Sequence, residues 1–208
     1  MKHCMLAMLL CLCVACAPKI RAPLVPTESS VAVAHFVQPQ HDWELMAGVL
    51  PEQKPVIPAE SLDVLDQALQ AALEKKSGRP ILHSDMVRQC EEIVLASKSR
   101  NKFETVEYWK SVGSCMQADF LLVPFVTRWQ ERQGGEWGVT TPAAVTLDIY
   151  LIETATGQVR RYHFEEEQRG LAENLLQGKR FFKRKGKWVT PLEIAVDAVG
   201  EGVAELGL

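Results

Sequence analysis

The sequence predicts an α/β (α+β) fold in which helices pack on a single mixed β-sheet that ends in a late antiparallel meander. Two observations predict it. Segments with helical periodicity alternate with short β-rich segments in the first half, whereas consecutive alternating strands fill residues 118–166. The expected order is β-α-β-α-α-β-β-β-α-α. Because the helices come early and the meander late, one mixed sheet covered by helices is the economical arrangement.

The first predicted strand and helix have clear sequence patterns. Residues 30–39, SVAVAHFVQP, show the β-branched alternation and the proline stop of a strand. Residues 58–78 carry leucines at helical spacing, with Ser61 available to cap the helix and Gly78 to end it.

A second strand and two further helices follow. The short strand RPILHS (79–84) leads to Ser84, which is expected to cap a helix that continues to about residue 97. KFETVEYWKSVGSCMQA (102–118) is the next helical pattern.

The second half predicts the meander. DFLLVPFVTRWQER (119–132) is a long β-run in which Pro124 indicates a bulge or an edge. Residues 142–168 form two alternating strands around Ala155-Thr156-Gly157, where Gly157 supplies the positive φ of a tight hairpin.

Two helices complete the expected fold. LAENLLQG (171–178) is a short helical pattern. In the C-terminal helix Thr190 is the cap, Pro191 takes the first helical position and Glu193 completes a capping box. Gly200-Glu201-Gly202 lies within that helix and predicts a close helix–helix contact.

The N-terminus has the form of a secretory signal, with a positive start and an apolar run that reaches Ala15. A membrane-spanning helix needs about 20 apolar residues, and Pro18 ends this run sooner. We therefore expect residues 1–15 to be a signal peptide, residues 16–30 an acylated, proline-rich tether and residues 31–208 a single α/β periplasmic domain.

Cys13-Val14-Ala15-Cys16 resembles the lipobox of bacterial lipoproteins, with Cys13 where leucine is usual. The resemblance implies that Cys16 carries a diacylglycerol and becomes the first mature residue. Fatty-acyl groups such as palmitate would then anchor the protein to the membrane. Each buried CH₂ adds about 0.8 kcal/mol of membrane affinity. Ala17, in place of aspartate, favours the outer membrane by resemblance, in its inner, periplasm-facing leaflet. An ordinary cleaved signal and a CxxC redox or metal site are the alternatives.

The cysteine count and the charge limit what the mature chain can be. Four of the six cysteines lie in the signal or at its end, which leaves Cys90 and Cys115. An exported chain could pair them as a disulfide between neighbouring helices, and two buried thiols are the alternative. The formal net charge of −3 favours no nucleic-acid partner.

Four stretches carry a family resemblance: VAVAHF, PILHSDMVRQC, ADFLLVPFVTRW (118–129) and AVTLDIYLIETATGQVRRYHFEE (144–166). They resemble a group that comprises the curli-secretion lipoprotein, the penicillin-binding-protein activator lipoproteins and the amino-terminal domain of the Tol-system propeller protein. The resemblance implies a domain that docks, and it allows a homo-oligomeric ring. RWQERQGGEWGVTTPA (128–143) is short and glycine-rich and lacks the alternating run of about ten residues that a barrel strand needs, so no pore is expected.

No motif indicates catalysis, a metal or a cofactor. The sequence has no nucleophile elbow, P-loop or HExxH pattern, and its histidines show no metal spacing. We therefore expect a protein that is not an enzyme. His41-Asp42 beside Trp43 is the nearest approach to a polar site, and it supports the alternative of an envelope hydrolase or transferase that uses the 38–57 loop.

One segment concentrates positive charge. Basic and aromatic residues interleave in GKRFFKRKGKW, and they predict a patch for an anionic partner surface: Lys179, Arg180, Lys183, Arg184, Lys185 and Lys187. The alternative is a solvated turn whose aromatic side chains enter the core and whose charge is neutralised by Glu165, Glu166 and Glu167. The expected function is a lipid-anchored, periplasm-facing binding or assembly lipoprotein that docks on an envelope protein in secretion, cell-wall synthesis or appendage assembly.

Overall fold

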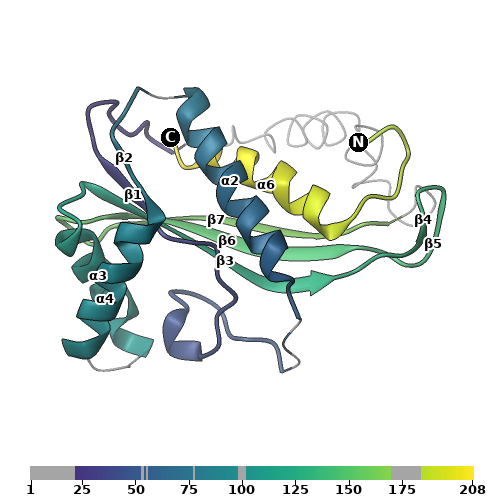
Figure 1. Ribbon diagram of the computed structural model, residues 1–208, viewed down its shortest axis with the longest axis horizontal. Helices are drawn as coiled ribbons and strands as arrows, with labels where there is room; N and C mark the ends of the chain where they lie inside the picture. The colour runs from purple at the N-terminus through teal and green to yellow at the C-terminus, as the bar shows by residue number, and fades with distance from the viewer. Residues whose placement is uncertain (1–21, 53, 55, 77, 98–101, 170–183) are drawn as a thin grey trace, which may run out of the picture.

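The computed structural model describes residues 22–208 except 53, 55, 77, 98–101 and 170–183. One mixed five-stranded sheet runs through it in the order β2-β1-β3-β6-β7 (Figure 1). β1 is parallel to both neighbours, and β3, β6 and β7 are antiparallel. The predicted fold class and late meander are confirmed. The strands are β1 Val31–Val33, β2 Ile81–Leu82, β3 Phe120–Gln130, β6 Ala144–Glu153 and β7 Val159–Glu167.

Helices cover both faces of the sheet (Figure 1). α2 (Ala59–Lys76) and α6 (Pro191–Glu205) lie side by side on one face. α3 (Ser84–Ser97) and α4 (Thr105–Cys115) pack on the other face near the start of β3. The remaining elements are the 3-10 turns η2 (Asp42–Glu44) and η3 (Lys102–Glu104) and a separate hairpin, β4 (Gln133–Gly135) and β5 (Gly138–Thr141).

The domain has a hydrophobic core on each face of the sheet, because successive side chains along β6 point to opposite faces. Leu147, Ile149 and Leu151 point toward α2 and α6, whereas Tyr150 and Ile152 point toward α3 and α4. A strand buried on both faces is apolar at nearly every position, which is why β3 and β6 read as long hydrophobic runs.

The predicted leucines of α2 are placed in the core, with Leu65, Leu69 and Leu73 all buried. The predicted cap of α2 is wrong, because α2 begins at Ala59 and Ser61 lies within its first turn. α3 begins at Ser84 and ends at Ser97, which agrees with the prediction to within the spread of helix-end assignments.

The C-terminal helix begins as predicted. Thr190 accepts the Glu193 N–H at 3.2 Å, and the Glu193 carboxylate accepts the Thr190 N–H at 2.8 Å. The expected helix–helix contact of Gly202 is wrong, because this glycine faces the sheet. A Cβ there would lie 2.7 Å from the ring of Tyr162 and 2.9 Å from Ile149.

Pro124 lies inside β3, a central strand. Ala34 donates to the Leu122 carbonyl at 2.9 Å, and Val126 donates to the Val37 carbonyl at 3.0 Å. Pro124 falls between these bonds, where the chain after β1 has left the sheet, so its missing N–H leaves no neighbour unpaired. The expected bulge occurs later in β3, between Val126 and Arg128.

Within the described part of the chain, no helix is long and apolar enough to cross a membrane.

Candidate partner-binding surface

A glycine-flanked hairpin extends the molecule beyond the end of β3. Gly135 pairs with Gly138 across a two-residue loop, Glu136-Trp137. The indole of Trp137 is 76% exposed, which is unusual for a side chain of this size. The sequence analysis missed this hairpin, although the glycines on both sides of Glu136-Trp137 were a usable turn signal.

The stretch that precedes α6 is fixed against this hairpin. The backbone N–H of Trp188 donates to the backbone carbonyl of Glu136 at 2.8 Å. The side chain of Gln168, just after β7, bridges the same stretch: its Nε2 donates to the Lys187 carbonyl at 2.8 Å and its Oε1 accepts the Val189 N–H at 2.9 Å. The backbone around Lys187 is therefore held at a defined place.

The basic residues of the predicted patch have different environments. Arg184 is nearly buried and forms ion pairs with Glu166, which is 5% exposed, and with Asp197 at 3.4 Å. The neutralisation expected from Glu166 is thus present. Glu167 instead binds Arg128 at 2.8 Å.

Two lysines remain at the surface. Lys185 is exposed, and Lys187 is 42% exposed. The Lys187 ammonium lies 2.9 Å from the Glu136 carboxylate and 5.4 Å from the centre of the Trp137 ring. The hydrogen bond and charge of Lys187 lower the pKa of Glu136. Lys179, Arg180 and Lys183 lie outside the described residues.

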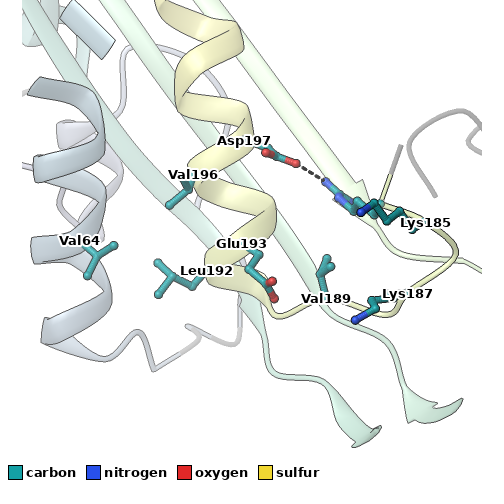
Figure 2. Close-up of a pocket in the computed structure, with 9 residues that line it drawn as sticks. Val64, Lys185, Lys187, Val189, Leu192, Glu193, Val196 and Asp197 are labelled. Atoms are coloured by element: carbon teal, nitrogen blue, oxygen red, sulfur yellow. Dashed lines mark hydrogen bonds and ion pairs between the residues drawn. The ribbon is translucent and has the colours of Figure 1, made fainter. Parts of the chain in front are cut away.

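A shallow groove of about 600 Å³ extends from Val64 of α2 across the first turns of α6 to Lys185 and Lys187 (Figure 2). Val64 of α2 faces Leu192 and Val196 of α6 across it. Val64 and Val196 are 38% and 36% exposed. The groove therefore combines an apolar part with a charged part, where the carboxylates of Glu193 and Asp197 lie among Arg184, Lys185 and Lys187. We call it the α2–α6 groove.

The chain enters the domain at the opposite end of the sheet. Val25 donates to the Gly207 carbonyl at 2.9 Å, and Arg160 donates to the Pro23 carbonyl at 2.7 Å. Asp119, just before β3, accepts both the backbone N–H and the hydroxyl of Ser30 at 2.8 and 2.9 Å. The first described residues are thus fastened beside the start of β3.

Cys90 of α3 and Cys115 at the end of α4 form a disulfide, with their sulfurs 1.98 Å apart and their Cα atoms 5.8 Å apart. Cys90 is buried among the residues under α3 and α4. The bond joins the two helices that the sequence analysis expected it to join. Cys16 lies outside the described residues.

His41 and Asp42 take part in the local structure of the loop. The His41 N–H donates to the Glu44 carboxylate at 3.0 Å, and Asp42 accepts the Leu50 N–H at 3.1 Å. The His41 ring stacks on Trp43 at 6.2 Å. Asp42 and Glu44 therefore hold loop backbone. Among the described residues no cluster of three or more His, Cys, Asp or Glu side chains has the placement of a metal site.

The sequence analysis also missed a charged cluster on the sheet. Asp148 is 4% exposed, and its Oδ1 lies 2.7 Å from Arg161 Nε and 2.8 Å from His163 Nδ1. The hydrogen bond to Asp148 raises the pKa of Arg161. Because strands alternate, Asp148 and its partners on β7 share one face, and only the register between the strands reveals that they meet.

Neither a protein-family model nor a curated protein matches the chain. Similar solved structures include the PelC dodecamer from Paraburkholderia phytofirmans (12% identity, 90% of this chain and 94% of that chain, TM-score 0.47). They also include the LpoB C-terminal domain from Salmonella enterica (12%, 71% and 88%, TM-score 0.41) and lipoprotein GNA1162 from Neisseria meningitidis (13%, 76% and 98%, TM-score 0.37). The lipoprotein group that the sequence resembles is thus represented among its structural neighbours, at low identity.

Proposed function

We propose that this protein is an acylated lipoprotein of the bacterial envelope, anchored through Cys16 in the periplasm-facing leaflet of the outer membrane. Its domain binds another envelope protein and performs no catalysis. One observation carries the proposal: the chain enters the domain at one end of the sheet, and the exposed Trp137, the lysines and the α2–α6 groove lie toward the other end.

Chain length supports this separation of anchor and binding surface. The seven residues from Cys16 to Pro23 span at most about 25 Å when fully extended. β3 alone, with 11 residues, is about 33 Å long, and the Trp137 hairpin lies beyond its end. An acyl group on Cys16 therefore stays near the end where Pro23 is fastened, and the hairpin remains available to a partner.

The chemistry of the surface supports an acidic and apolar partner segment. Val64, Leu192 and Val196 can bury apolar side chains, which contributes about 25 cal/mol per Å². Lys185, exposed at the charged end of the groove, favours a carboxylate, which forms charge-assisted hydrogen bonds with an ammonium group. We therefore expect a protein segment that carries an acidic residue beside an apolar stretch.

Metabolic labelling tests the anchor. Cells given radiolabelled palmitate should label the wild-type chain, and the Cys16→Ser variant should be unlabelled and should retain an uncleaved signal. An unlabelled wild-type protein, or a variant that behaves like wild type, would refute the lipid anchor.

Site-specific photocrosslinking in intact cells tests the binding surface. A photoreactive residue at Val196 should capture a defined partner, and the same residue at Gln70, on α2 away from the groove, should not. The captured band should weaken when Lys185→Glu reverses the charge beside the groove. Equal capture from both positions, or capture that ignores Lys185→Glu, would argue against this surface.

A further inference from the structure

β7 is the outer strand on its side of the sheet. It pairs with β6 along nine residues, and its other edge pairs with no strand in the described part of the chain. The opposite edge strand, β2, has two residues. An edge of nine residues is long enough to accept another strand, and natural proteins usually protect such an edge.

The hydrogen-bond pattern shows which residues of β7 present backbone groups outward. Glu153 donates to the Gln158 carbonyl, and Gln168 donates to the Ala143 carbonyl, both at 2.9 Å. In an antiparallel pair every second residue bonds to the neighbour, so the even-numbered residues from 158 to 168 face β6. The outward N–H and C=O groups therefore belong to Val159, Arg161, His163, Glu165 and Glu167.

The charges of β7 are arranged so that the strand complements itself. Arg160 and Arg161 occupy its beginning, and Glu165, Glu166 and Glu167 occupy its end. Two copies that run antiparallel place arginine opposite glutamate, whereas two parallel copies place like charges together. Opposite charges across a strand pair stabilise it and like charges destabilise it, so this pattern selects one orientation.

We propose that β7 pairs with β7 of a second copy of this chain, antiparallel, with the two-fold axis at His163. In this register all nine residues are paired, and the outward-facing residues of both strands meet as hydrogen-bonded pairs: His163 with His163, Arg161 with Glu165 and Val159 with Glu167. The two sheets become one. This assignment stands on the sheet edge and does not depend on the lipid anchor or on the α2–α6 groove.

The side chains that meet across this junction are accessible. Arg161 is 36% exposed, His163 45% and Glu165 61%. Glu165 lies 3.9 Å from Arg128, and a carboxylate with one distant partner can reach an arginine of the second copy. Asp148, 2.8 Å from His163, supplies negative charge beside the imidazoles that meet on the axis.

Glu165→Pro tests the backbone pairing. The N–H of Glu165 points away from β6, so proline at this position removes a donor from the outer edge and leaves the β6–β7 bonds in place. The matched control is Glu165→Ala, which removes the same carboxylate and keeps the N–H. The detergent-extracted full chain is followed by sedimentation equilibrium, and thermal unfolding verifies that each variant is folded.

We expect two copies per particle for the wild type and for Glu165→Ala, and one copy for Glu165→Pro. Glu165→Arg places like charges at two symmetric positions, and it should raise the dimer dissociation constant about tenfold or more. A wild type that is monomeric at about 100 μM, a ring of more than two copies, or a folded Glu165→Pro variant that stays dimeric would each overturn the proposal.

Discussion

Asp66 of α2 binds the ring of His35 and the backbone of Phe36 at the same time. One carboxylate oxygen lies 2.7 Å from His35 Nδ1, and the other accepts the Phe36 N–H at 2.6 Å. Both residues follow β1, where the chain leaves the sheet. A single carboxylate therefore fixes the course of that departing chain against the helix above it.

Removing this carboxylate should destabilise the domain. We expect Asp66→Ala to lower the free energy of unfolding by about 2 kcal/mol, because hydrogen bonds to charged groups contribute about 1.5–3 kcal/mol. Asp63→Ala, an exposed position of the same helix, is the control and should change stability by less than about 0.5 kcal/mol. Urea unfolding measures both, and equal effects would show that Asp66 does not act through these bonds.

The Cys90–Cys115 disulfide should contribute on the order of 3 kcal/mol, since it closes a loop with a sequence separation of 25. Reduction of the disulfide should therefore lower the free energy of unfolding by about this amount. The Cys90→Ser, Cys115→Ser double variant should show the same loss, measured as a lower midpoint of unfolding. Mass analysis of protein alkylated without prior reduction should find no reactive thiol at either position. Two alkylated cysteines in the native protein would contradict the bond.

The Glu166–Arg184 pair gives a third prediction. Both side chains are at most 10% exposed, and truncating Glu166 removes one ion pair of the Arg184 guanidinium while its pair with Asp197 at 3.4 Å remains. Glu166→Ala should cost up to about 3 kcal/mol, the lower end of the loss when a buried ion pair is broken. The Glu166→Ala, Arg184→Ala double variant should be less destabilised than the sum of the single variants. Additive losses in a double-mutant cycle would mean that the two groups are not coupled.

Two glycines of α6 should respond in opposite directions to alanine. Gly202→Ala places a methyl group within 3 Å of Tyr162 and Ile149, so it should force α6 away from the sheet and cost about 1–3 kcal/mol. Gly200 has open space around its Cβ position, and Gly200→Ala should stabilise the helix by up to about 1 kcal/mol. Thermal unfolding distinguishes them, and two shifts of the same sign would count against this packing.

Local patterns predicted most of the fold. The Thr190–Glu193 capping box and the Gly157 hairpin depend on neighbouring residues, so the sequence alone identifies them, and both are present. Fold class followed from the order of such elements. The start of α2 at Ala59 differs from the predicted cap at Ser61 because more than one nearby residue can begin a helix.

The binding surface was harder to predict from the sequence, because it depends on contacts between segments that are far apart in the chain. Arg184 and Lys187 are three residues apart in one basic run, yet Arg184 is buried against Glu166 and Lys187 reaches Glu136 on a hairpin 51 residues away. The number of charges in the segment does not show which basic residue is buried and which is exposed. The outer edge of β7 likewise becomes visible only when the strand order is known.

Pro124 gives the central strand two unlike halves. Residues 120–122 pair with β1 on one side and with β6 on the other. Beyond the proline, the described residues on the β1 side form one isolated bridge, between Val37 and Phe125. Deuterium should consequently enter the second half earlier than the first, because protection of an amide follows the cost of its local opening.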